Sequence, residues 1–388
     1  MNRSVTGEYE ITNVGGELVK AFIPSKLPPD PPLDLAGLQE ALARAHLALG
    51  RLDGLSRLLP DAGLFLYSYI RKEAVLSSQI EGTQSSIADL MRFEVADAPG
   101  APENADVVEV SNYVRAMTHG LNRLRQDDFP LSNRLLREIH AELLSRGRGN
   151  DKRPGEFRQS QVWIGGSRPG NAHFVPPPPR VVQDCMGALE QFLHATGDDM
   201  PSLIRAGICH VQFETIHPFL DGNGRVGRLL ITFMLLHSGV LSEPLLYLSL
   251  FFKQHRQTYY QLLDGVRQTG DWEAWLDFFL QGVAETAEGA ESTAQSLLQM
   301  FNDNEGRIQQ EVRAPASALR VHQALKEYPI ASIQSIMERT SLSFNAASSG
   351  MRILEELDIA QEVTGQRRNR LFGYREYMDA LYEGTEPL

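Results

Sequence analysis

Apolar residues recur at three- and four-residue intervals along most of the chain, which predicts a mainly α-helical protein. Ser132 is a suitable N-cap for one of the expected helices, and Gly82 follows another at the point where it ends. The periodic segments predict helices at about 35–59, 62–81, 106–126, 132–145, 181–195, 202–215, 229–238, 245–266 and 272–301.

Three segments depart from the helical pattern. The first 34 residues are rich in proline and glycine, which predicts an extended N-terminal arm. Two prolines and a glycine at 96–104 predict a loop. Two short β-type runs, 161–165 and 172–175, flank a Gly-Ser-Arg-Pro-Gly-Asn turn, so we expect a β-hairpin inside the helical protein.

The C-terminal residues have a pattern of their own. Three short helices are expected at 316–328, 332–340 and 343–357, followed by strands at 360–363 and 370–374 around a basic turn. Three helices followed by a hairpin is the order of a winged helix, a variant of the helix-turn-helix. The expected domains are the arm (1–34), an N-terminal helical region (35–130), a central core (131–302) and a winged-helix-like domain (315–388).

Composition restricts the class of protein. A chain of 388 residues with 42% hydrophobic and 22% charged residues is typical of a soluble protein with several domains. The net charge of −12 excludes nucleic-acid binding over the whole surface but allows a local basic patch. Two cysteines without metal-ligand spacing predict buried thiols, and the absence of an apolar leader or membrane-length run predicts a cytoplasmic location.

One segment, 217–228, concentrates the chemically useful residues of the chain. Two glycines permit sharp backbone turns before an expected helix start near Gly224, where exposed N–H groups favour an anion. Arg225 and Arg228 lie three residues apart on that helix and suit a di- or triphosphate. Asp221 suits a Mg²⁺ ion beside the phosphates, and His217 suits a general base. The Gly-x-Gly-x-x-Gly substring also matches a dinucleotide fingerprint, but a helix rather than a strand precedes it.

The segment His217-x-Phe219-x-Asp221-Gly222-Asn223-Gly224-Arg225-x-x-Arg228 resembles the complete signature of the Fic family. The resemblance implies an α-helical Fic core within 131–302 and transfer of AMP from ATP, with Mg²⁺, to a Ser, Thr or Tyr hydroxyl of a protein. It implies that His217 is the base, that Asp221 holds Mg²⁺, and that Asn223 and the loop amides contact the phosphates. The nucleotide-binding set that it implies comprises Glu81, His217, Asp221, Gly222, Asn223, Gly224, Arg225, Val226, Gly227, Arg228 and Tyr259.

The same resemblance gives the hairpin a role as a flap that pairs with the backbone of the target protein. Its residues would be Val162, Trp163, Ile164, His173, Phe174 and Val175. An ordinary surface hairpin is the alternative. Tyr259 and Tyr260 resemble the aromatic residues beside the adenine in the family, although core residues would give the same pattern.

An upstream segment resembles the inhibitory motif of the family, Ser/Thr-x-x-x-Glu-Gly/Asn. Ser77 and Glu81 are four residues apart near the expected end of a helix. The resemblance implies that Glu81 pairs with Arg228 and occupies the space of the γ-phosphate, as in the class with an N-terminal inhibitory helix. The alternative is an ordinary helix end with an exposed glutamate.

Three functions therefore remain open. The first is an autoinhibited protein adenylyltransferase that also modifies itself, with removal of AMP as a further activity. The second is another Fic-type nucleotidyl or phosphoryl transfer. The third is a DNA-binding regulator with a nucleotide-sensing core, because basic residues gather in the C-terminal domain; protein contact or a homodimer through this domain is the alternative. These residues are Arg352, Arg367, Arg368, Arg370 and Arg375.

Overall fold

The structure is a computed structural model that describes residues 3–58, 63–95, 105–126, 129–195, 199–311 and 315–387. The predicted loop at 96–104 lies outside this set. The chain forms two compact units, and each is built from segments that are distant in sequence. Within the described ranges, no helix is both long and apolar enough to cross a bilayer.

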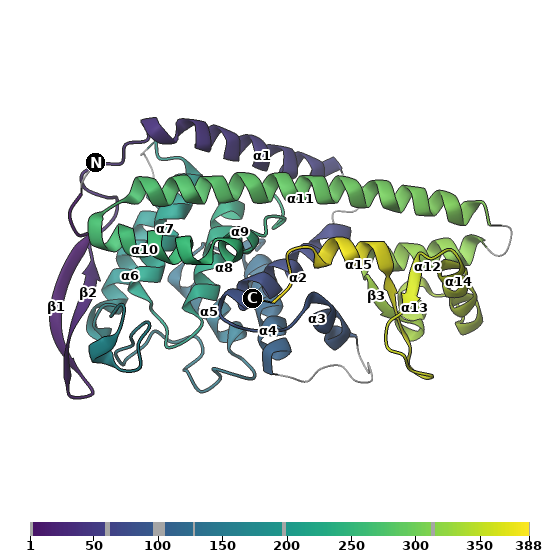
Figure 1. The fold of residues 1–388 in the computed structure, drawn as a ribbon, viewed down its shortest axis with the longest axis horizontal. Helices are drawn as coiled ribbons and strands as arrows, with labels where there is room; N and C mark the ends of the chain where they lie inside the picture. Colours follow the sequence, from purple (N-terminus) through teal and green to yellow (C-terminus); the bar gives the residue numbers. More distant parts are fainter. Residues whose placement is uncertain are drawn as a thin grey trace. The chain divides into compact units, whose positions relative to one another are not determined.

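The first unit comprises residues 1–50, 112–242 and 251–286 and is mainly helical (Figure 1). At its centre, α7 and α8 pack together, and their side chains are buried around nearly the whole circumference of both helices. The elements that lie entirely in this unit are β1 (Gly7–Val14), β2 (Glu17–Pro24), α5 (Asn133–Leu143), α6 (Pro179–Leu193), α7 (Ser202–Ile216), α8 (Asn223–His237) and α10 (Arg256–Thr269).

The second unit comprises residues 51–111, 243–250 and 287–388. Its elements are α2 (Gly63–Ile80), α3 (Ile87–Glu94), α12 (Pro315–Glu327), β3 (Ile330–Ser332), α13 (Ile333–Thr340), α14 (Phe344–Glu356), β4 (Ala360–Glu362), β5 (Leu371–Tyr374) and α15 (Arg375–Tyr382). Four further helices have residues in both units: α1 (Gln39–Leu58), α4 (Ala105–Leu124), α9 (Ser249–Gln254) and α11 (Trp272–Gln309).

Most predicted helices are present, and Ser132 caps α5 by accepting a hydrogen bond from the backbone N–H of Leu135. One prediction was wrong: the helix expected at 245–266 is two helices, α9 and α10, which are interrupted at His255. The long helix α11 also continues to Gln309 instead of ending near Phe301. Periodicity placed these helices well, but it does not detect a local break when apolar spacing continues through it.

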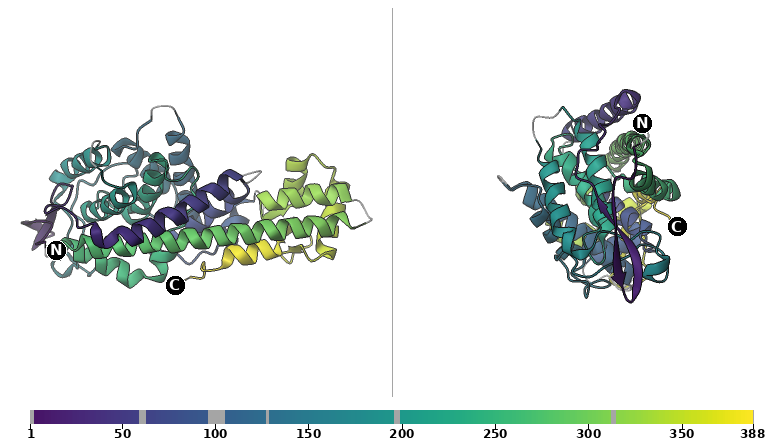
Figure 2. Two further views of the ribbon diagram at one scale, coloured as in Figure 1. Left: turned by 90° about the horizontal axis from the view of Figure 1, so that it is seen from above. Right: turned by 90° about the vertical axis from the view of Figure 1, so that its left-hand side faces the viewer.

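The N-terminal arm contains a β-hairpin that the helical pattern did not predict. Strands β1 and β2 are antiparallel, and Gly15 and Gly16 form the turn with positive φ angles (Figure 2). A Gly-Gly pair between two alternating runs is a recognised hairpin signal. The prolines at 27–32 predicted only the irregular part of the arm, which follows this hairpin.

The C-terminal elements follow the predicted order, with two additions: a short strand, β3, before α13 and a helix, α15, after β5. In the three-stranded sheet, β5 lies between β3 and β4. Ser341, with φ of 54°, joins α13 to α14, and Ser332 and Ser343 cap the two helices. A Cβ at Gly350 would lie 2.9 Å from the carbonyl oxygen of Ser317, so glycine permits the close packing of α14 on α12.

Candidate active site

The segment 217–222 connects the two central helices of the first unit. His217 ends α7 in the left-handed conformation, with φ of 49°, which is uncommon for a residue with a Cβ. Gly222, with φ of 77°, immediately precedes α8, which begins at Asn223. The connection therefore turns sharply at both ends, and strain at His217 is typical of a functional position.

Asn223 fixes the shape of this connection. Its Oδ1 accepts a hydrogen bond from the N–H of Phe219 at 2.8 Å, and its Nδ2 donates to the carbonyl oxygen of the same residue at 2.9 Å. The side chain is 2% exposed. Because both ends of the amide are engaged, the structure gives Asn223 a positioning role in addition to any contact with phosphate.

His140 supports the connection from α5. Its ring stacks on Phe219 with centroids 3.8 Å apart, and its Nδ1 accepts a hydrogen bond from Gly155 N–H at 2.8 Å. Nε2 therefore carries the hydrogen and donates to the carbonyl oxygen of Asp221 at 3.0 Å. Burial lowers the pKa of His140 to about 4, so the ring is neutral at pH 7.

Arg158 holds the other side of the connection with a buried guanidinium. Its Nε donates to the carbonyl oxygen of His217 at 2.8 Å, and its Nη2 donates to Pro177 O at 2.6 Å and to Ile216 O at 3.3 Å. Burial lowers the pKa of Arg158 to about 10. The side chain thus contacts the last turn of α7, the left-handed residue and the segment after the flap.

Neither His140 nor Arg158 was singled out from the sequence. Both bind main-chain carbonyls of residues far along the chain, and such contacts leave no spacing pattern. The available signals were indirect: a histidine on the buried face of an amphipathic helix, and an arginine in the turn-rich segment before the hairpin.

The predicted phosphate-binding arginines lie on the first turns of α8. The residues Arg225 and Arg228 are 4% and 3% exposed. A carboxylate oxygen of Asp221 lies 3.6 Å from Nη2 of Arg225 and accepts a hydrogen bond from Gly222 N–H at 2.6 Å. The structure therefore brings the predicted carboxylate, one guanidinium and the helix N-terminus together.

Glycine at 227 permits close packing of α7 and α8. A Cβ there would lie 2.3 Å from Oε1 of Glu214, on α7. The carbonyl oxygen of Gly227 accepts a hydrogen bond from Nδ1 of His210 at 3.0 Å, and the hydroxyl of Tyr259 donates to Nε2 of His210 at 2.8 Å. Burial lowers the pKa of His210 to about 3, so this imidazole is neutral.

The position of Tyr259 differs from the expectation of an adenine-side aromatic residue. It is 1% exposed, and its ring stacks on Phe252 with centroids 4.6 Å apart. This position agrees with the alternative of a core residue, because the hydroxyl and the ring face already have partners. The neighbouring Tyr260 is 42% exposed.

The flap is less regular than predicted. Instead of two strands, it has one antiparallel bridge, Ile164 with Phe174, and a 3₁₀ turn at Pro169–Asn171. The N–H of Ile164 donates to Phe174 O at 2.8 Å, and Phe22 of β2 donates to Val175 O at 2.9 Å. Glycines and prolines on both sides limit further pairing.

The predicted flap residues divide by exposure. Phe174 and Val175 are buried, Val162 and Ile164 are half-buried, and Trp163 and His173 are exposed. The N-terminal hairpin thus adds to the flap on the side of Val175, and Val175 packs with Val19 and Ala21.

The predicted inhibitory residues belong to the second unit. Ser77 is buried on α2, and Glu81 is exposed one residue beyond the end of this helix. Gly82 follows with φ of 102°, and its N–H donates to Gln79 O at 3.0 Å. The side chain of Gln79 donates to Ser85 O at 3.2 Å and Thr385 O at 2.8 Å, which anchors this end of α2. The predicted helix end is therefore present.

A preformed metal cage is absent from the described part of the chain, where no three His, Cys, Asp or Glu residues gather at metal-binding distance. One partly exposed carboxylate, Asp221, remains near the N-terminus of α8. This donor set fits Mg²⁺, which commonly takes one or two carboxylates and obtains its other ligands from water and substrate phosphates.

Comparisons with known proteins agree with this geometry. The Fic/DOC family N-terminal model matches residues 39–122, and the Fic/DOC family model matches residues 130–235. The "Protein adenylyltransferase Fic" of Culex quinquefasciatus is 30% identical over 238 residues, which are 59% of this chain and 43% of that protein. The protein of the same name from Aedes aegypti is 29% identical over 214 residues, 54% of this chain and 39% of that protein. The chain thus spans less than half the length of these curated relatives.

Solved structures show the same fold. A Fic family protein from Desulfovibrio desulfuricans G20 superposes with a TM-score of 0.58 at 19% identity, covering 89% of this chain and 98% of that one. A Fic domain containing signaling protein from Bacteroides thetaiotaomicron gives a TM-score of 0.51 at 17% identity, covering 65% and 95%. Two family models match consecutive segments and the fold is shared, so the chain contains a Fic domain preceded by a Fic/DOC family N-terminal region.

Proposed function

We propose that the chain is an autoinhibited protein adenylyltransferase. A Ser, Thr or Tyr hydroxyl of a polypeptide attacks the α-phosphorus of ATP, and His217 accepts its proton. The new oxygen–phosphorus bond forms as the bond to the β-phosphate bridging oxygen breaks, and pyrophosphate leaves. Arg225 and Arg228 bind the phosphates, and the amides at the start of α8 stabilise the added negative charge.

The observation that supports this proposal best is the connection between α7 and α8. It places His217, with its left-handed backbone, at one end and an anion-favouring helix N-terminus with two buried guanidiniums at the other. The names of the curated relatives point to the same activity. Asp221 would hold Mg²⁺, which neutralises phosphate charge when bound. Arg158, His140 and Asn223 act as positioning residues.

The first test removes the proposed base. With labelled ATP, His217→Ala is expected to reduce self-modification at least about 100-fold, because general-base catalysis contributes this much or more. His46→Ala, which removes an exposed imidazole, is the matched control. Continued transfer of AMP by His217→Ala would rule out His217 as the base.

We further propose that Glu81 pairs with Arg228 and thereby excludes productive binding of the γ-phosphate. Replacing a carboxylate that competes with phosphate should increase transfer, so Glu81→Gly is expected to raise self-modification about tenfold or more. The control is Asp358→Gly, another exposed carboxylate beyond a helix end, whose φ of 57° suits glycine. A Glu81→Gly variant that binds ATP but is no more active than wild type would contradict inhibition by Glu81.

The proposed substrate is a polypeptide because the flap offers main-chain groups for strand addition. Exposed Trp163 and His173 would contact the target, while buried Phe174 and Val175 fix the flap. Tyr259 would act on the nucleotide site through His210 and Gly227, since its hydroxyl binds Nε2 of His210.

Other Fic-type transfers are the second candidate, because the same connection would hold other phosphorylated donors. Mass spectrometry of self-modified protein distinguishes them: the gain of one AMP supports adenylylation, and the gain of one phosphate supports phosphorylation. Loss of AMP from the modified wild type on further incubation, with no such loss from the modified Glu81→Gly variant, would add removal of AMP to the proposed activities.

A further inference from the structure

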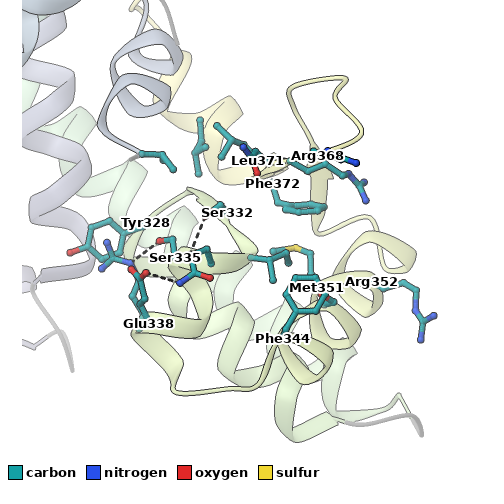
Figure 3. A pocket seen from close by; sticks show the side chains of 18 of the residues that line it. Tyr328, Ser332, Ser335, Glu338, Phe344, Met351, Arg352, Arg368, Leu371 and Phe372 are labelled. Atoms are coloured by element: carbon teal, nitrogen blue, oxygen red, sulfur yellow. Dashed lines mark hydrogen bonds between the residues drawn. The ribbon is translucent and has the colours of Figure 1, made fainter. Parts of the chain in front are cut away.

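The second unit contains a hollow of about 1400 Å³ that the proposed transfer reaction does not use (Figure 3). One wall is α14, and another is the loop between β4 and β5, which we call the wing loop (residues 363–370). The strand residues Leu371 and Phe372 lie between them in Figure 3. Residues of α13, among them Ser335 and Glu338, form a further wall. On one side, the hollow therefore lies between α14 and a loop with basic residues.

The wall formed by α14 is a row of polar side chains on one helical face. Asn345, Ser348, Ser349 and Arg352 are separated by three, four and seven residues, so they share this face. The opposite face, which includes Gly350, packs against α12. The row is made of small or flexible hydrogen-bonding groups, and such a helix can approach another polar surface closely.

The wing loop carries exposed positive charge, and hydrogen bonds hold its first residues in place. The carboxylate of Glu362 accepts hydrogen bonds from the N–H groups of Thr364, at 2.8 Å, and Gly365, at 2.9 Å, which hold the start of the loop. Beyond this point, Arg367 and Arg368 are exposed. Among the described residues, no carboxylate lies within ion-pair distance of either guanidinium.

The carboxylates that line the hollow already have partners. Glu94 binds Arg71 at 2.5 Å, Glu355 binds Arg370 at 3.1 Å, and Glu338 accepts a hydrogen bond from Gln334 at 2.9 Å. The amide of Gln334 is neutral, so Glu338 keeps its charge, but Arg339, Arg367 and Arg368 also line the hollow. The net charge of the hollow is therefore positive, although the whole chain carries a net charge of −12. A polyanion is the complementary ligand.

We propose that α14 and the wing loop form a binding site for duplex DNA. Together, Asn345, Ser348, Ser349, Arg352, Arg367 and Arg368 define the α14–wing surface. Amide, hydroxyl and guanidinium groups along one helix suit base edges in the major groove, and the wing arginines suit phosphates. A protein-binding surface would instead be rich in exposed aromatic and aliphatic residues. Phe344, 61% exposed, is the one large apolar side chain among the described residues of the hollow that is exposed.

The test uses the full chain and a fluorescent random-sequence DNA duplex, with binding followed by anisotropy at salt concentrations of about 50 to 200 mM. The wild type is expected to bind with micromolar affinity, which falls steeply with salt. In Arg367→Ala/Arg368→Ala, affinity should fall about tenfold, and the slope of log K against log salt should decrease in magnitude by about 2. Arg51→Ala/Arg57→Ala, which removes two exposed arginines from α1, is the matched control.

Each outcome of this experiment either supports or overturns the proposed DNA-binding site. A wing variant with reduced affinity and slope beside an unchanged control supports it. Absence of wild-type binding at the lowest salt, or equal binding by the wing variant, overturns it. Poly-glutamate that displaces the duplex and binds more tightly, with the same dependence on the wing arginines, would instead assign the surface to an acidic protein. Circular dichroism confirms that the exposed substitutions leave the fold intact.

Discussion

The connection between α7 and α8 and the α14–wing surface both present arginines, but they hold them in opposite ways. Arg225 and Arg228 are at most 4% exposed, and Arg158, Asn223 and His140 fix the backbone beside them. Arg367 and Arg368 are exposed in the middle of a loop whose two ends are held by Glu362 and by the ion pair of Arg370 with Glu355. Burying a charge is costly without fixed partners, whereas an exposed one needs little support. The first region therefore suits a ligand bound in one defined geometry, and the second suits a ligand held mainly by its charge.

The largest expected effect of a single substitution on stability tests the support of the buried region. Arg158→Met removes the donors to the carbonyl oxygens of His217, Ile216 and Pro177, and should lower the free energy of unfolding by about 3 kcal/mol. Arg367→Met, on the exposed wing loop, should change it by less than about 0.5 kcal/mol. Urea unfolding measures both variants. Similar losses of unfolding free energy in the two variants would contradict the conclusion that the fold depends on the buried arginine and not on the exposed one.

The second prediction concerns acid. His140 and His210 have pKa values lowered by burial to about 4 and about 3, so the folded chain resists protonation that the unfolded chain accepts near pH 6.5. Their neutral rings favour folding above pH 6.5, and this contribution decreases as pH falls toward 4. Each histidine should remove about 1.4 kcal/mol of stability per pH unit across this window.

Urea unfolding at neutral pH and at about pH 5 measures this loss. The stability of His140→Asn should change less with pH than that of the wild type, and the stability of His46→Gln should change as much as that of the wild type. An unfolding midpoint equal at both pH values would contradict neutral buried imidazoles. Because arginine stays protonated throughout this range, DNA binding by the wing loop should not share the pH dependence.

The contrast also explains what the sequence could predict. The segment from His217 to Arg228 was identified because a fixed geometry requires particular residues at particular spacings. Most helices followed from apolar periodicity, as did the order of the predicted C-terminal elements, but the short helices α3 and α15 were not predicted. Arg158 and His140 were missed because they bind carbonyl groups far along the chain. The β1–β2 hairpin was missed although Gly15 and Gly16 marked its turn, and the flap has one bridge because its glycines and prolines limit pairing.

The smallest expected effect compares the same residue type in the two regions. Asn223→Ala leaves the N–H and carbonyl oxygen of Phe219 without their side-chain partners, so it should cost about 2 kcal/mol of stability. Asn345→Ala, on the exposed face of α14, should change stability by less than about 0.5 kcal/mol. Thermal unfolding measures both, and labelled ATP and duplex DNA then provide separate readouts. Asn223→Ala should reduce AMP transfer without affecting DNA binding, and Asn345→Ala should do the reverse. If either variant altered both activities, the two regions would not be functionally separate.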